Sequence, residues 1–183
     1  KRGEKAQVVV DPGHHAPGTN IEFIVAALLR ENKLGGFDFN SRFYADDDLM
    51  AGAADPFQLF RIMHEVIRGG GYTPHIAFML DQCHNIDPKI PAIIRSVMNV
   101  QEATAKALLI DRHALTAAQR DGDVLEANAV LMDAYNTDVR PLLAEIRQEM
   151  GLDPDPIAAY RRSGWAEKIV EERVGGQQAG WGA

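Results

Sequence analysis

Three aspartates, Asp11, Asp38 and Asp81, stand at or near the ends of three short apolar segments, and His14 and His15 follow the first of them within one turn. Turn formation explains an aspartate before Pro-Gly, but it does not explain two histidines. Carboxylates that converge repel one another and raise one another's pKa values unless a cation neutralises them. We therefore expect a divalent metal site, and this many carboxylates fits two ions better than one.

The loop after the second segment adds three consecutive aspartates, Asp46, Asp47 and Asp48. Mostly oxygen ligands with one or two imidazoles suit Mg²⁺, Mn²⁺ or Co²⁺ better than a thiolate-binding ion. The alternative is that Asp11 only forms a turn and that the loop is a solvated acidic stretch. Asp38 is harder to explain in that way, because strand alternation places it on the opposite face from its neighbours Phe37 and Phe39.

The remaining histidines have ordinary explanations. His84 follows Asp81 closely and is as well explained by a hydrogen-bonded core histidine as by a ligand. His64 and His113 are expected on helix surfaces.

The elements that must position these residues alternate between strand and helix. Residues 7–10, 37–40 and 75–81 have the pattern of short buried strands, and helices are expected from Ile21, from Asp55 and from about Ala92 to about Arg112. Alternating strands and helices predict a parallel sheet with right-handed crossovers, in which ligands bind at the carboxyl ends of the strands. Asp11, Asp38 and Asp81 are all expected at the carboxyl ends of these strands.

The second half of the chain lacks strand patterns. Residues 121–151 predict a helix bent near Pro141, another helix is expected around 165–173, and the glycine-rich end is expected to be irregular. We therefore expect two regions: residues 1–114 with three strand–helix units, and residues 115–183 as a helical extension with a tail.

Composition limits the class of protein. The chain has 183 residues, a formal charge of −7 and 46% hydrophobic residues, which favours a folded domain and argues against a nucleic-acid partner. A single cysteine, Cys83, excludes an internal disulfide, and no stretch approaches the length of a membrane span. These features predict a cytoplasmic protein, and the first residues suggest a chain that begins partway into a longer one.

Several motifs together resemble one enzyme family over about residues 8–165: VDPGHHAPGTNIEFIVA, FDFNSRFYADDDL, GAADPFQLFRI, MLDQCHN and AYRRSGW. They are similar to the carboxyl-terminal part of L-rhamnose isomerase, a relative of xylose isomerase with a (β/α)8 TIM barrel. The resemblance implies that the chain forms the last three βα units of such a barrel, followed by the helical extension.

The resemblance also implies a two-metal site for aldose–ketose interconversion, L-rhamnose to L-rhamnulose. Asp11, Asp38 and Asp81 correspond to ligands of the first ion, and His14, Asp46 and Asp48 to ligands of the second. The ions implied are most often Mn²⁺, with Co²⁺, Mg²⁺ or Zn²⁺ as alternatives. Asp81, His14 and Asp48 are the residues expected to take part in the reaction.

Two departures from the family pattern stand out. Many L-rhamnose isomerases have histidine at the position of Asp38, although xylose isomerases use a carboxylate there. The family's metal-binding glutamate, its nearby lysine and its aromatic pocket residues belong to earlier strands and are not in this chain. We therefore expect the missing amino-terminal half of the barrel, a small sugar and a homo-oligomer, a tetramer in the family, as partners.

Two other functions remain open at this stage. The first alternative to the isomerase is a non-catalytic metal- or sugar-binding fragment that completes a barrel with another chain. A metal-dependent hydrolase on the same type of barrel would also use clustered carboxylates. Its phosphate-binding variants need basic residues near the site, where only Arg42 stands close in sequence.

Overall fold

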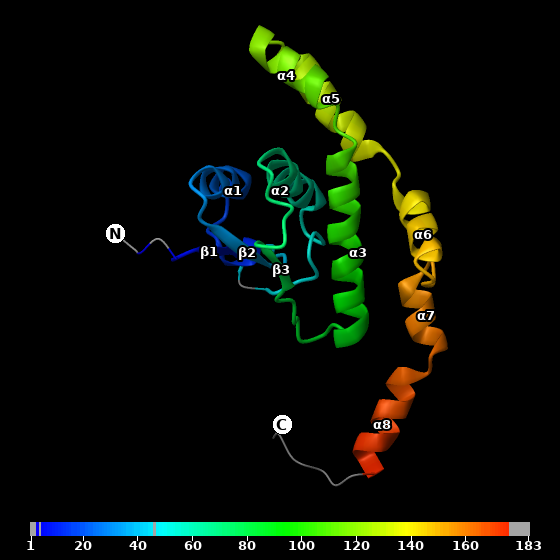
Figure 1. Cartoon of the computed structure of the whole chain (residues 1–183). Coiled ribbons are helices and arrows are strands. Elements are labelled where there is room, and N and C mark those ends of the chain that lie inside the picture. Colours follow the sequence, from blue (N-terminus) through cyan, green and yellow to red (C-terminus); the bar gives the residue numbers. More distant parts are fainter. Residues whose placement is uncertain (1–2, 4, 46, 176–183) are drawn as a thin grey trace. The chain divides into compact units, whose positions relative to one another are not determined.

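Three parallel strands form the sheet of this protein (Figure 1). The computed structural model describes residues 3, 5–45 and 47–175. The strands are β1 (Val8–Val10), β2 (Leu34–Phe39) and β3 (Ala77–Leu80). They lie in sequence order, and both pairs are parallel. The alternation of strand and helix predicted from the sequence is confirmed.

Each strand is followed by a helix: α1 (Ile21–Arg30), α2 (Pro56–Arg68) and α3 (Lys89–Leu108). Asn20 caps α1, because its side chain accepts a hydrogen bond from the amide of Phe23. Asp55 caps α2 in the same way, through the amide of Gln58. Pro56 opens α2 because the first turn of a helix needs no amide donor at that position.

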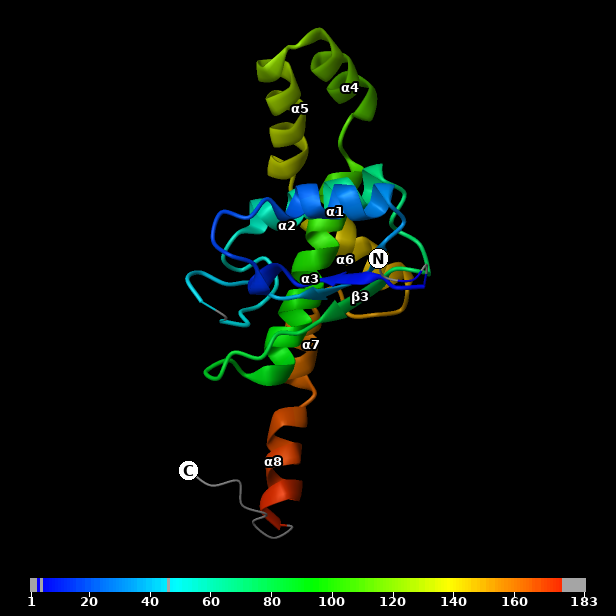
Figure 2. The ribbon, with the colours of Figure 1, turned by 90° about the vertical axis from the view of Figure 1, so that its left-hand side faces the viewer.

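The core lies between the sheet and these helices. In Figures 1 and 2, α1 and α2 lie on the same side of the sheet. Phe37 and Phe39 of β2 point to that side, are 0% and 1% exposed, and stack with ring centroids 4.7 Å apart. Phe60 of α2 is also fully buried. Aromatic pairs of this kind bury large apolar areas and account for much of the stability of a small core.

The opposite face of the sheet is open within the described residues. Val9 of β1 and Met79 of β3 are 52% and 42% exposed. Alternation along the strands puts Asp38 on this face as well, since Asp38 pairs in register with Met79. The acidic residues therefore belong to the uncovered face of the sheet.

Two predicted element boundaries are wrong. The second strand was expected at 37–40, but β2 begins at Leu34 and ends at Phe39. The glycines after Lys33 look like a helix stop, yet both lie in β2, where Gly36 pairs with Val9 of β1 and with Ala77 of β3. The third helix was expected to continue to about Arg112, but α3 ends at Leu108.

A helical hairpin follows α3. It consists of α4 (Arg112–Asp121), capped by Asp111, and α5 (Val124–Asn136), capped by Asp123. Gly122 joins the two helices with a φ of 74°, which glycine adopts without strain. Leu115 of α4 is buried in the same core cluster as the sheet.

The chain divides into two compact units, Lys1–Leu143 and Ala144–Ala183. Helix α6 (Arg140–Glu149) begins in the first unit, and the second unit also holds α7 (Pro156–Arg162) and α8 (Trp165–Gly175). The predicted helix over 121–151 is in fact two helices, because α5 ends at Asn136 and a new helix begins at Arg140.

Three further predictions concern the organisation of the chain. The expected boundary between residues 114 and 115 stays a prediction. The irregular tail falls mostly on residues 176–183, outside the described part of the chain. Among the helices of the described residues, none is long and apolar enough to cross a membrane.

Candidate metal centre

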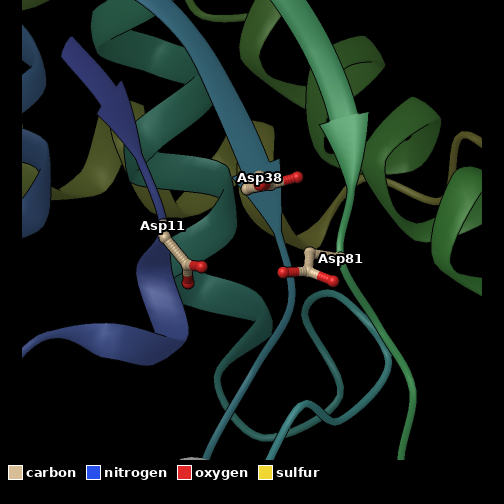
Figure 3. A group of neighbouring side chains, drawn as sticks. All are labelled: Asp11, Asp38 and Asp81. Carbon is tan, nitrogen blue, oxygen red and sulfur yellow. The ribbon is translucent and has the colours of Figure 1, made fainter.

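Asp11, Asp38 and Asp81 meet at the carboxyl ends of the three strands (Figure 3). Each offers one carboxylate oxygen, and these three oxygen atoms all lie within 4.8 Å of one another. Asp11 directly follows β1, Asp38 lies near the end of β2, and Asp81 directly follows β3. Such a group is the arrangement expected for a divalent cation with oxygen ligands.

Strand geometry explains why the three side chains converge. Parallel neighbours lie about 4.8 Å apart, and alternate residues along a strand share one face. Asp38 is one residue from both Phe37 and Phe39, so burial of the two rings turns its carboxylate to the open face. Adjacent aspartates at equivalent strand ends then face the same space.

The surroundings of Asp38 disfavour its ionised form. Desolvation raises the pKa of Asp38, and the negative charges of Asp81 and Asp11 raise it further, while His14 acts in the opposite direction. A bound cation would remove this repulsion, because it favours the ionised form of each carboxylate. The three aspartates are therefore the residues of the described chain that could hold a cation.

Asp11 is held in place by three neighbours. Its Oδ1 accepts hydrogen bonds from the amide of Gly13 at 3.0 Å and from Nδ2 of Asn40 at 2.9 Å. Its Oδ2 lies 2.7 Å from Nδ1 of His14. A carboxylate has about four acceptor positions, so these contacts leave room for a ligand bond at Oδ2. Asp11 orients the imidazole of His14 in the way that carboxylates orient metal-binding histidines.

The loop after β2 has a defined structure of its own. Ser41 and Leu49 close it with an isolated antiparallel bridge. One carboxylate oxygen of Asp47 accepts from the amides of Phe43 and Tyr44, at 2.9 and 3.3 Å, and these bonds lower the pKa of Asp47. Asp47 therefore stabilises the conformation of this loop through its backbone hydrogen bonds.

The second predicted ligand set is not assembled within the described residues. Asp46 lies outside them. His14 and Asp48 do not join a group of three metal-binding side chains in the described part of the chain, where Asp11, Asp38 and Asp81 form the group found. Asp48 adopts a φ of 45°, in the left-handed region that aspartate tolerates better than most residues. The second metal set stays a prediction.

Two histidines differ in their surroundings. His64 was expected on a helix surface, but it is 7% exposed on α2, and Arg112 approaches its Nδ1 at 3.4 Å. Burial lowers the pKa of His64, and the charges of Arg112 and Arg68 lower it further, against the opposite effect of Glu65. The surface assignment is wrong because the side chain of Arg112, which also donates to the carbonyl of Ala107, lies against His64. His113 is exposed, as predicted.

The sequence analysis did not single out Asn40, the residue that links the end of β2 to the turn after β1. Asn40 is 3% exposed and binds Asp11, although it is 29 positions away in the sequence. A polar residue directly after a buried strand was the available signal, because such a residue needs a hydrogen-bond partner when it is buried.

The fold and the cluster together define a parallel α/β sheet with three carboxylates gathered at the carboxyl ends of its strands. Two curated proteins are similar to this chain. A protein of Mesorhizobium japonicum named as a probable sugar isomerase is 46% identical over 176 residues. A protein of Rhizobium meliloti with the same description is 45% identical over 176 residues.

The matches cover nearly all of this chain but less than half of each relative. Each covers 93% of this chain but 40% of the relative. The chain therefore spans well under half the length of the curated relatives that it matches. No protein-family model matches the chain.

Proposed function

We propose that this chain is the metal-binding part of a sugar isomerase that interconverts an aldose and a ketose, L-rhamnose and L-rhamnulose. The observation that carries the proposal is the convergence of Asp11, Asp38 and Asp81 at the carboxyl end of a parallel sheet. The two relatives named as probable sugar isomerases support the reaction class. The choice of L-rhamnose rests on the motif resemblance alone.

The donor set fits a divalent cation. Carboxylate oxygens are hard ligands, which divalent cations of this kind prefer. Burial and the neighbouring carboxylates raise the pKa of Asp38, and a bound cation would lower it again. We propose Mn²⁺, with Co²⁺, Mg²⁺ or Zn²⁺ as alternatives, at the three aspartates. A second ion is proposed at His14, Asp46 and Asp48. When bound, such ions supply Lewis-acid polarisation of the sugar oxygens.

In the proposed reaction, the residues of this chain bind the sugar and orient the imidazole of His14. The hydrogen on C2 of the aldose moves to C1 and the hydroxyl proton on O2 moves to O1, so the reaction balances without a co-reactant. Asp81 is the most exposed of the three aspartates and is proposed to face the substrate. Asp11 holds Nδ1 of His14, which fixes the ring that we assign, with Asp48, to proton transfer.

Further ligands are proposed to come from outside this chain. Three carboxylates provide about half of an octahedral coordination shell. The sheet also leaves Val9 and Met79 exposed, and the edges of β1 and β3 are unpaired among the described residues. We propose that the remaining part of a (β/α)8 barrel covers this face and adds the missing ligands. A tetramer is proposed on the resemblance, and light scattering of the complete protein tests it.

The test is metal binding and isomerisation by the complete protein. We expect calorimetry to detect Mn²⁺ binding and chelation to abolish conversion of L-rhamnose. Asp11→Asn and Asp81→Asn should each remove one ion or weaken its binding by about tenfold or more. Asp133→Asn is the matched control, because Asp133 is an exposed residue of α5 outside the cluster.

The outcomes separate the competing functions. Metal binding without turnover of any aldose would favour the non-catalytic fragment. Turnover of a phosphate ester instead of a sugar would favour the hydrolase. Absence of divalent-ion binding in the complete protein would overturn the proposal.

A further inference from the structure

Arg112, the first residue of α4, contacts two other helices. Its Nη2 donates to the carbonyl of Ala107 near the end of α3, at 2.9 Å, and its Nη1 lies 3.4 Å from Nδ1 of His64 on α2. The carbonyls in the last turn of a helix have no partner within the helix, and the first contact satisfies one of them. The second contact connects the start of the α4–α5 hairpin with α2, across 48 positions in the sequence.

The contact with Arg112 requires one protonation state of the imidazole. A guanidinium has donors and no acceptor, so Nδ1 of His64 must be the acceptor and must carry no proton. The proton of the neutral ring is then on Nε2, which lies 4.0 Å from Oε1 of Glu65. The contact between Arg112 and His64 therefore exists only while the imidazole is neutral.

A proton added to Nδ1 of His64 would break this contact. It would place an N–H group and a positive charge opposite Arg112, on a side chain that is 7% exposed and is poorly screened by water. Glu65 offers a nearby carboxylate, but its Oε2 is already paired with Arg68 at 2.6 Å. Burial is the largest cause that lowers the pKa of His64. The charges of Arg112 and Arg68 act in the same direction, and the charge of Glu65 opposes them.

The way α4 packs makes a local effect of this contact possible. Helix α4 packs chiefly against α5 of the same hairpin, and α5 in turn packs against α3. Leu115, one turn after Arg112, is buried in the core cluster. The contact of Arg112 with His64 is a direct polar link between α4 and α2. Its loss should loosen the start of α4 without opening the sheet, because segments with few buried contacts open separately.

We propose that His64 and Arg112 form a proton-sensitive latch, which fastens the start of the α4–α5 hairpin to α2 while the imidazole is neutral and releases it when the imidazole takes up a proton. Because the folded protein resists protonation of this ring, release belongs to pH values below about 6.5, the ordinary pKa of histidine. The residues assigned to the metal ions take no part in the latch, so it is independent of the proposed function.

Hydrogen exchange of the complete protein, measured by mass spectrometry, tests the latch. After correction for the intrinsic pH dependence of exchange, the protection of the α4 amides should fall about three- to tenfold between pH 7.5 and pH 5.5. The upper value follows because pH 5.5 lies about one unit below the ordinary pKa of histidine. Low concentrations of urea should change the exchange of α4 much less than that of β2, since a local opening exposes little surface.

Three variants separate the latch from other effects of acid. His64→Gln keeps an acceptor that does not titrate, so the protection of α4 should change by less than about twofold over the same pH range. His113→Gln is the matched control, because His113 is exposed on α4 beside Arg112, and it should keep the wild-type pH dependence. Arg112→Met removes the other half of the latch. In this variant α4 should exchange about threefold faster or more at pH 7.5, with a smaller response to pH.

A second measurement reports on His64 even where a variant at that position does not fold. Slow deuterium exchange at Cε1 of the imidazole gives the pKa of an individual histidine. The pKa of His64 should be higher in Arg112→Met than in the wild type, because a cation beside Nδ1 has been removed. An unchanged pKa of His64 in Arg112→Met, the wild-type pH dependence in His64→Gln, or urea dependence of α4 exchange equal to that of β2 would each overturn the latch.

Discussion

At the scale of single residues, the close approach of Asn40 to Gly13 allows the hydrogen bond between Asn40 and Asp11. A Cβ atom built on Gly13 would lie 2.0 Å from Oδ1 of Asn40. Only glycine therefore allows Asn40 to approach and donate to Asp11. The requirement at this position is close approach, because Gly13 does not adopt a positive φ.

Gly13→Ala should displace Asn40 and break its hydrogen bond to Asp11. We expect the free energy of unfolding of the complete protein to fall by about 1–3 kcal/mol, the usual cost of overpacking, together with weaker Mn²⁺ binding. Denaturant titration and calorimetry measure the two effects. Gly3→Ala is the control, because nothing lies within 4 Å of a Cβ at that position. Wild-type metal affinity in Gly13→Ala would contradict this role of Asn40.

The buried side chain of His64 should make the stability of the protein depend on pH. Burial, Arg112 and Arg68 lower its pKa in the folded protein, and Glu65 opposes them. The unfolded chain therefore binds a proton below about pH 6.5 while the folded protein does not, so stability falls as the pH drops through this range.

His64→Gln should remove this contribution. Between about pH 7 and about pH 5.5, its free energy of unfolding should decrease less than that of the wild type. Urea titrations at several pH values provide the measurement, with exposed His113→Gln as the control. Identical pH profiles of wild type and His64→Gln would show that His64 does not control the effect.

At the scale of elements, α3 holds the loop that follows β2. Ser96 on α3 is fully buried, and its Oγ accepts a hydrogen bond from the amide of Ala51 at 3.1 Å. Asn99, one turn later, donates to the carbonyl of Ala51 at 2.8 Å. These two bonds attach the end of the loop that carries Asp48 to the long helix of the next βα unit.

Ser96→Ala should leave the amide of Ala51 buried without this partner. We expect a loss of about 1–3 kcal/mol in the free energy of unfolding, the cost of an unsatisfied buried donor. Hydrogen exchange should also become faster at Ala51 and its neighbours. Ser163→Ala is a comparison variant in an exposed turn and should change stability much less. Unchanged exchange at Ala51 would argue against the attachment.

At the scale of the whole molecule, the open face of the sheet is the main feature. Val9 and Met79 are exposed there beside the aspartates, whereas the other face is packed under helices. A parallel sheet is normally covered on both faces. The apolar residues on the open face thus require a cover that the described residues do not supply.

Met79→Lys tests this requirement. Expressed as the 183-residue segment, the wild type should be insoluble or oligomeric, and Met79→Lys should increase its soluble fraction. In the complete protein the same substitution should be destabilising, because it buries a charge. Thr73→Lys, in an exposed loop, is the control for added charge. A monomeric wild-type segment with a sharp two-state melting transition would contradict the prediction.

The sequence by itself determined the order of strands and helices and the grouping of the three aspartates. Alternation around Phe37 and Phe39 turns Asp38 to the opposite face, and the carboxyl ends of parallel strands meet at one edge, so local pattern was sufficient for the three aspartates. It was not sufficient where residues far apart in the chain meet. Gly36, directly before Phe37, became a strand residue only because β1 and β3 pair with it on both sides.

The tertiary structure alone decided the surroundings of the site. The contact of Asn40 with Asp11 and Gly13 and the burial of His64 under Arg112 each join segments that lie apart in the sequence. Periodicity describes which face of an element a side chain occupies, but it does not state what packs against that face. Hydrogen bonding and burial depend on that partner, and the partner is set by how the helices pack on the sheet.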